Sequence, residues 1–172
     1  MILKGFKEKS NQKFINKLIG YRRAQVSTKK IESVGIVLNL TEFDDFETFR
    51  IFFEDLKLHP NKIKIVGFVE DSKLIESSIE LLFSDKQIGW KGKIKNDELQ
   101  SFLNTPFDAL ISYYKNNNLE LDLITALSKA NFKVGISNKD ERLHDLILDV
   151  LPNQFNVFKQ EFIKYLTILK KI

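Results

Sequence analysis

The chain has 172 residues, of which 43% are hydrophobic and 12% aromatic, which suffices for one domain with a single core. The absence of Cys excludes disulfides, thiolate metal sites and Cys nucleophiles. His59 and His144 stand far apart and outside any His-based metal spacing. No metal site is predicted from these residues, and only carboxylates remain as candidate metal ligands.

Charge is distributed unevenly along the chain. Residues 1–30 carry nine basic side chains and one acidic one, a net charge of +8, whereas the remainder carries 18 basic and 22 acidic residues, a net charge of −4. We therefore divide the chain into a basic N-terminal arm, 1–30, and a single α/β domain, 31–172. No apolar stretch approaches the roughly 20 residues of a membrane span, and no secretory signal is visible, so a cytoplasmic protein is expected.

The basic arm has the pattern of a helix from about residue 3 to 19. A partial apolar stripe runs between the lysines and consists of Phe6, Phe14, Ile15, Leu18 and Ile19. The pattern leaves open whether the arm packs on the domain or projects from it. Gly20 is a plausible stop, and residues 21–30 read as an exposed connector.

The first strand is predicted at 32–40, where a nearly continuous apolar run is typical of a parallel sheet buried on both faces. Thr41 should cap the next helix, whose Phe stripe faces the sheet. A second strand follows at 62–69, then a short helix. Residues 80–94 are predicted to hold one short strand, a loop around Trp90 and a second short strand, before a helix that Asn96 caps and Pro106 ends.

Residues 107–137 read as a complete strand, helix, strand unit, whose length implies parallel strands. A final strand near 146–150 has a short connection that allows an antiparallel edge position, and a long amphipathic helix closes the chain at about 153–171. The fold class is therefore α/β: a three-layer, Rossmann-like sandwich of five or six mostly parallel strands. The first strand should be central, beside the strand at 107–113.

In such a fold, ligands bind at the C-terminal ends of the strands, near the point where strand order reverses. Polar or aromatic residues at those ends are the candidate ligand-binding set: Asn39, Thr41, Ser112, Tyr113, Tyr114, Ser137, Asn138 and Arg142. Most of these residue types are equally common as helix caps and turn formers.

The phosphate-binding loop of nucleotide enzymes is missing from the first strand-to-helix turn, LNLTEFDDF, which has neither GxGxxG nor GxxxxGK[ST]. Nucleotide cofactors are thus disfavoured, and no cofactor is predicted. No nucleophile elbow or Ser, His, Asp arrangement is present, so no catalytic residue is assigned.

Basic residues supply a second candidate surface, for an acidic partner. Trp90 stands among lysines in residues 86–93, an arrangement that can stack a base while pairing with phosphate. The alternative is a Trp that anchors its loop to the core. The candidate partner-binding residues are Lys4, Lys7, Lys13, Lys17, Arg22, Arg23, Lys86, Trp90, Lys91 and Lys93.

Distinctive segments occur along nearly the whole chain: GIVLNLTEFDDFE, FSDKQIGWKGKIKN, TPFDALISYY, LSKANFKVGISNKDERLHDLIL and KYLTILKK. With the basic N-terminal helix, they resemble a family of short uncharacterised cytosolic proteins from Bacteroidetes. That resemblance implies no activity. FDALISYY to FKVGIS is also similar, more faintly, to the N-terminal half of heptosyltransferase-type glycosyltransferases, whose second domain has no counterpart here.

Three functions follow as hypotheses. The first is a non-catalytic domain that binds an acidic macromolecule, RNA or a ribonucleoprotein, through the basic arm. The second is a small-ligand or sugar-nucleotide pocket at the strand ends, and the third is an assembly subunit. The sequence leaves the oligomeric state open.

Overall fold

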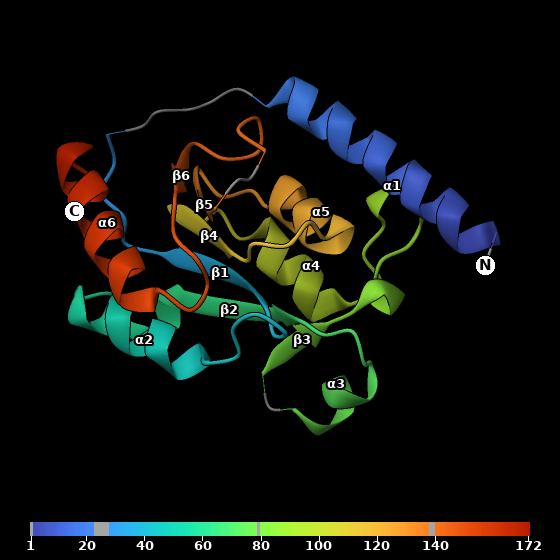
Figure 1. Cartoon of the computed structure of the whole chain (residues 1–172), viewed down its shortest axis with the longest axis horizontal. Coiled ribbons are helices and arrows are strands. Elements are labelled where there is room, and N and C mark those ends of the chain that lie inside the picture. Colours follow the sequence, from blue (N-terminus) through green and yellow to red (C-terminus); the bar gives the residue numbers. More distant parts are fainter. Residues whose placement is uncertain (1, 23–27, 79, 138–139) are drawn as a thin grey trace.

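A computed structural model of the chain describes residues 2–22, 28–78, 80–137 and 140–172 (Figure 1). Its longer helices are α1 (Ile2–Tyr21), α2 (Phe46–Asp55), α4 (Asp97–Asn104), α5 (Leu119–Leu127) and α6 (Phe155–Ile168), and α3 (Lys73–Ser77) is short. Its strands are β1 (Val34–Asn39), β2 (Ile63–Phe68), β3 (Leu81–Phe83), β4 (Ala109–Tyr113), β5 (Phe132–Ile136) and β6 (Leu146–Leu148).

Within the described residues, the strands form one six-stranded sheet in the order β3-β2-β1-β4-β5-β6. Each neighbouring pair is parallel, with Val34 opposite Ile63 on one side and Ala109 on the other. The predicted α/β class, the central first strand and its pairing with the strand at 107–113 are confirmed. Strand order therefore reverses between β1 and β4.

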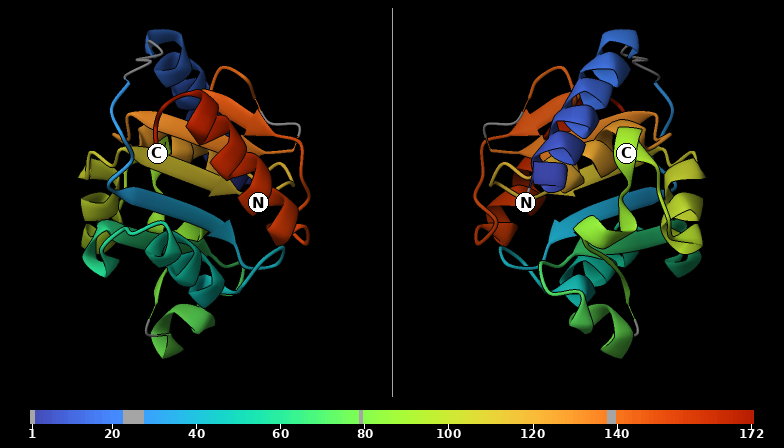
Figure 2. Two further views of the ribbon diagram at one scale, coloured as in Figure 1. Left: turned by 90° about the vertical axis from the view of Figure 1, so that its left-hand side faces the viewer. Right: turned by 90° about the vertical axis from the view of Figure 1, so that its right-hand side faces the viewer.

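Helices cover both faces of the sheet, which makes three layers (Figure 2). Alternate strand residues supply the two cores: Ile36 and Leu38 face α2 and α6, whereas Val37 faces α1, α4 and α5. This alternation is the period of two expected of a strand buried on both sides. The core beneath α2 and α6 is rich in aromatic rings, with Phe49 5.0 Å from Tyr113 between ring centroids.

Two local predictions in the first half of the sheet need correction. Thr41 does not cap a helix; it lies in a turn, and Asp45 caps α2 by accepting from the backbone N–H of Thr48 at 2.9 Å. After β3, the chain forms two single-turn helices, η2 (Asp85–Gln87) and η3 (Trp90–Gly92), instead of a second strand. Only one isolated antiparallel bridge, Ile88 with Ile94, is found in this described segment.

The antiparallel edge position that the short connection allowed is not adopted, because β6 is parallel to β5. Asp145 fixes the start of β6 beside the start of β5: its backbone N–H donates to the Lys133 carbonyl at 2.8 Å, and its carboxylate accepts from the Lys133 N–H at 2.8 Å. His144 packs directly on Gly135, where a Cβ would come within 2.9 Å of the imidazole. The segment between β5 and β6 thus covers this part of the sheet with its own buried side chains, in the place of a crossover helix.

Candidate functional site

The C-terminal end of β1, where a ligand was predicted, is occupied by the chain's own side chains. Asn39 donates from its amide to Glu42 at 2.9 Å and accepts from the hydroxyl of Thr41 at 2.9 Å. The Glu42 carboxylate then accepts from the backbone N–H groups of Lys115 at 2.6 Å and Asn116 at 3.1 Å. Glu42 thus links the loop after β1 to the loop after β4, across the point where strand order reverses.

The three predicted residues at the end of β4 point into the two cores and are fully buried. Ser112 shares a hydrogen bond of 2.9 Å with Thr125, and the Tyr114 hydroxyl donates to Asp122 at 2.9 Å. Tyr113 donates to the carbonyl of Pro152 at 2.9 Å. Burial raises the pKa of both tyrosines, so their hydroxyls stay protonated and serve as donors.

Ser137 and Arg142 lie near the end of β5 without facing a common hollow. Ser137 has a left-handed backbone, with φ of 59°, and its hydroxyl donates to the carbonyl of Val150 at 2.6 Å. Arg142 pairs with Asp140 at 2.7 Å, and both side chains are exposed. Asn138 lies outside the described residues. The predicted set therefore does not form one site.

The basic helix α1 docks on the domain rather than projecting from it. It lies against α5 and η3, with Asn11, Ile15 and Ile19 buried. The Asn11 side chain accepts from the backbone N–H of Gly92 at 3.0 Å, an internal contact that the sequence pattern did not indicate. Gly92 has φ of +70°, and a Cβ there would come within 2.7 Å of the Phe14 ring. Phe6, which belongs to the apolar stripe of the sequence, is exposed.

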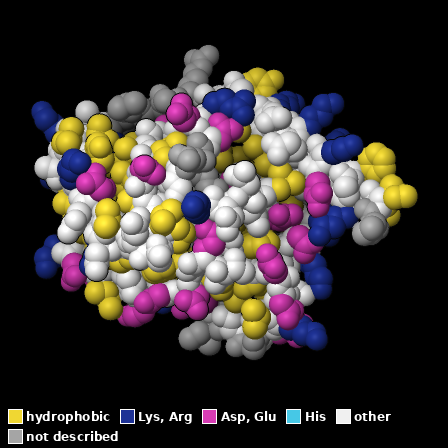
Figure 3. Space-filling model, viewed as in Figure 1, with side chains coloured by type: hydrophobic (Ala, Val, Ile, Leu, Met, Phe, Trp, Pro, Cys, Tyr) yellow, Lys and Arg dark blue, Asp and Glu magenta, His cyan; other side chains and the backbone are white. Residues whose placement is uncertain are grey.

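Docking divides the lysines of α1 into two groups. Lys7 donates to the carbonyls of Asp85 at 3.1 Å and Ile88 at 3.2 Å, which attaches the helix to η2. The others are exposed: Lys4, Lys9, Lys13 and Lys17. Of these, Lys9, Lys13 and Lys17 lie on the side of the helix opposite its buried residues. Figure 3 shows Lys and Arg side chains along the edge of the molecule that α1 forms.

Residues 86–93 lie next to this helix. We use the name α1–η3 surface for the exposed residues of the two predicted basic segments: Lys4, Lys9, Lys13, Lys17, Lys86, Trp90, Lys91 and Lys93. Trp90 is 50% exposed, so it does not serve mainly as a core anchor. Lys91 and Lys93 are exposed on either side of Gly92, and Lys86 donates to the hydroxyl of Ser72 at 2.6 Å. The surface therefore combines an exposed indole with several exposed ammonium groups.

Two arginines complete the predicted partner set. Arg22, at the end of α1, pairs with Asp145 at 2.5 Å and donates to the Arg142 carbonyl at 3.4 Å, which makes it a tie between α1 and the β6 edge. Arg23 lies outside the described residues.

The connector after α1 is tied to the sheet by a carboxylate. Asp108, 6% exposed, accepts from Lys29 at 2.5 Å, from the N–H of Glu32 at 3.1 Å and from the Ser33 hydroxyl at 2.9 Å. Burial alone would raise the pKa of Asp108, but these hydrogen bonds outweigh it, so the pKa is lowered. The carboxylate is thus held ionised as an anchor for residues 29–33.

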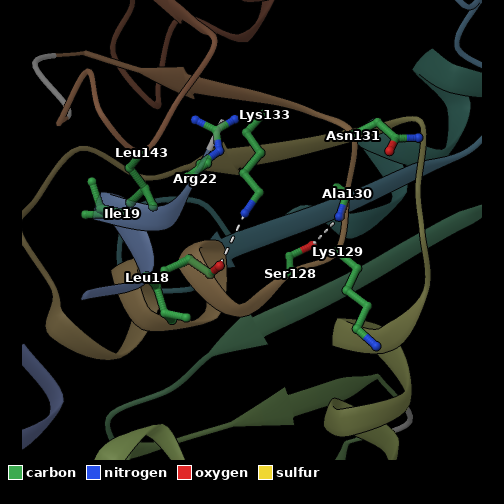
Figure 4. A pocket seen from close by; sticks show the side chains of 10 residues that line it. Leu18, Ile19, Arg22, Ser128, Lys129, Ala130, Asn131, Lys133 and Leu143 are labelled. Atoms are coloured by element: carbon green, nitrogen blue, oxygen red, sulfur yellow. Dashed lines mark hydrogen bonds between the residues drawn. The ribbon is translucent and has the colours of Figure 1, made fainter. Parts of the chain in front are cut away.

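Lys133, which is not among the predicted site residues, lines a pocket of about 280 Å³ between the end of α1 and the loop after α5 (Figure 4). Its side chain is 3% exposed. The available signal was a charged residue inside an apolar strand run, FKVGI, since a lysine buried on both faces of a sheet is rare.

The described ranges contain no group of three or more His, Asp or Glu placed to hold a metal ion. In the same ranges, every helix is too short or too polar to traverse a lipid bilayer.

The fold and its surfaces define a doubly wound α/β domain whose basic N-terminal helix is docked on one face. The chain belongs to DUF6913, a family of unknown function, which it matches over residues 7–169. No curated protein and no solved structure matches it.

Proposed function

We propose that this protein binds RNA, alone or within a ribonucleoprotein, through the α1–η3 surface. The observation that supports the proposal is the docking of α1 on η3, the segment that contains Trp90 and Lys91, while Lys9, Lys13 and Lys17 stay exposed. Ammonium groups neutralise phosphates, and an exposed indole stacks on unpaired bases.

The lysines form a row with a regular spacing. Lys9, Lys13 and Lys17 lie four residues apart, so they share one face of α1 and stand about 6 Å apart along its axis. Glu8 is the sole acidic residue among the described residues of α1. An extended polyanion can therefore follow the helix without meeting a line of negative charge.

A fixed surface reduces the cost of binding. Ile15 and Ile19 are buried against the domain, and Asn11 and Lys7 hydrogen-bond to the segment that carries Trp90. The basic helix is therefore already ordered, and a partner need not offset the entropy of folding it. Single-stranded RNA is the form that suits this surface best, because stacking on Trp90 requires an unpaired base.

The alternative, a small-ligand or sugar-nucleotide site at the strand ends, has less support. Glu42 already accepts from the backbone N–H groups of Lys115 and Asn116, which are the kind of donors that an anionic ligand would use. The similarity to glycosyltransferases that suggested a sugar-nucleotide site covers only residues 107–137. We also propose that the protein is cytoplasmic and comes from Bacteroidetes.

The direct test is a titration of the purified chain against fluorescently labelled single-stranded RNA, read by anisotropy, across about 50 to 200 mM salt. The expected result is saturable binding whose affinity falls with a log–log slope of about −0.7 for each phosphate contacted. Duplex RNA should bind more weakly, because its bases are not free to stack. Absent or salt-indifferent binding to single-stranded RNA would overturn the proposal.

A further inference from the structure

The pocket under α1 contains a lysine amine in a chemical setting that the RNA proposal does not use. Lys133 leaves β5 on the face covered by α1 and α5, and its ammonium nitrogen donates to the carbonyls of Thr125 at 2.6 Å and Ala126 at 3.4 Å, at the end of α5. Figure 4 shows the side chain crossing the pocket, with Arg22 beside it. The amine thus lines a pocket while being almost wholly removed from bulk water.

The charged groups around this amine come from two segments. Arg22 approaches from the end of α1 and Asp145 from the start of β6, whereas the Lys129 ammonium points away from Lys133 (Figure 4). Asp145 is already paired with Arg22 at 2.5 Å. Because Arg22 and Lys133 line the pocket and no Asp or Glu does, the pocket favours an anionic occupant.

Burial is the main cause that lowers the pKa of Lys133 to about 7; Arg22 acts in the same direction and Asp145 opposes it. A large share of the amine is therefore neutral at physiological pH. Neutral lysine amines in desolvated pockets next to another cation are the ones that attack carbonyl carbons.

The geometry points to a second site in this pocket, where Lys133 captures a small aldehyde or keto acid bearing a carboxylate as a reversible imine. The pocket, at about 280 Å³, fits a compound of a few carbon atoms. Arg22 would attract the carboxylate.

The chemistry balances without an oxidant or a cofactor. The nitrogen lone pair of neutral Lys133 forms the C–N bond as the C=O π bond breaks, and one amine proton moves to that oxygen to give a carbinolamine. The second amine proton leaves with the hydroxyl group as water and the C=N bond forms, so amine and carbonyl become imine and water. Hydrolysis returns both reactants.

The test uses glyoxylate, the smallest aldehyde that carries a carboxylate, with cyanoborohydride to reduce the imine to a stable adduct. The full folded chain is treated from about pH 6 to 10, and labelled peptides are quantified by mass spectrometry. Lys129, exposed in the loop four residues earlier, is the internal reference. Lys133 should be labelled at least about tenfold faster than Lys129 at pH 7, with a rate that levels off just above pH 7.

A lysine that only caps the end of α5 would behave differently: it would stay unlabelled in the folded chain and react only in urea, and that result would overturn the proposal. Labelling no faster than that of Lys129 would overturn it as well. Acetaldehyde, which has no charge, tests the anion preference. If it selects Lys133 over Lys129 as strongly as glyoxylate does, the carboxylate part of the proposal is wrong.

A variant provides a second readout. Lys133→Met should lose the adduct and any rise in melting temperature that glyoxylate produces in the parent chain, while Lys129→Met keeps both. Peptide-level labelling of the parent chain decides the matter if Lys133→Met does not fold.

Discussion

The Glu42 carboxylate accepts a hydrogen bond of 2.6 Å from the backbone N–H of Lys115, which joins two loops at the point where strand order reverses. In related architectures the N–H groups at such a position are free to bind an anionic ligand. Here a side chain of the protein satisfies them. These two N–H groups are therefore already hydrogen-bonded at the position where ligands bind in such folds.

Removing that carboxylate should both destabilise the chain and open an anion site. Glu42→Ala leaves the N–H groups of Lys115 and Asn116 without their partner and should cost about 1 to 2 kcal/mol in the free energy of unfolding, measured in urea. Phosphate should restore part of this loss in the variant beyond its general effect on the parent chain. An equal effect of phosphate on both proteins would show that the N–H groups are not available to an anion.

Asp108 should make the protein sensitive to acid. Its pKa is lowered because hydrogen bonds from Lys29, Glu32 and Ser33 outweigh its burial, so the stability it contributes is fully present above the unfolded value, about 4, and is lost as pH falls through the folded value. Asp108→Asn should cost about 1.5 to 3 kcal/mol at pH 7 and show less further loss below pH 4 than the parent. A constant difference between the two proteins from pH 7 to 3 would contradict this assignment.

Lys133 should give a pH dependence of the same sign in a higher pH window, because its folded-state pKa is lowered as well. Because its pKa is lower in the folded chain than in the unfolded chain, the unfolded state binds more protons between about pH 7 and 10, and folding stability rises with pH in that window. The parent should therefore gain stability relative to Lys133→Met by up to about 1.4 kcal/mol per pH unit. Urea unfolding at several pH values checks this, and a difference that does not change with pH would refute it.

The packing of α1 against η3 can be tested at Gly92. Gly92→Ala places a methyl group within 2.7 Å of the Phe14 ring at a backbone φ of +70°, and should cost about 1 to 3 kcal/mol in unfolding free energy. Limited proteolysis should then cut α1 more readily. Gly20→Ala is the matched control, since nothing lies within 4 Å of its added Cβ. Equal protease resistance of the two variants would argue against this packing of α1 on η3.

Trp90 should contribute stacking rather than charge to RNA binding. Trp90→Ala is expected to lower affinity by about 1 to 3 kcal/mol while leaving the salt slope unchanged. Because the chain has one Trp, quenching of its fluorescence reports the same contact directly. Unaltered affinity in the variant would remove Trp90 from the surface.

Sequence patterns predicted the layers of this fold well, because apolar runs such as Val34–Leu38 are dictated by burial on both faces of a parallel sheet. They failed where a distant contact decides the outcome. Phe6 fits the apolar period of α1, but the helix is docked so that this ring is 56% exposed. Thr41 and Asp45 are both acceptable caps, and only the turn made by Asn39 selects the second.

The candidate sites were less predictable than the fold. Strand-end residues such as Ser112 and Tyr113 were placed correctly along the chain, yet their partners, Thr125 and Pro152, belong to other elements. Local sequence cannot distinguish a hydroxyl that faces a ligand from one that faces the core. The link between Glu42 and Lys115 joins residues 73 positions apart and leaves no local signal.

The most direct test of the RNA proposal compares two charge-reversal variants with the same change in net charge. One carries Lys9→Glu, Lys13→Glu and Lys17→Glu on the outer side of α1; the other carries Lys62→Glu, Lys115→Glu and Lys170→Glu, which are exposed elsewhere. The measurement is the affinity of each for single-stranded RNA across the salt series. The account predicts that the α1 variant loses binding and reduces the salt slope by about 2, while the control stays near the parent. Equal loss in both variants would contradict a defined RNA-binding surface.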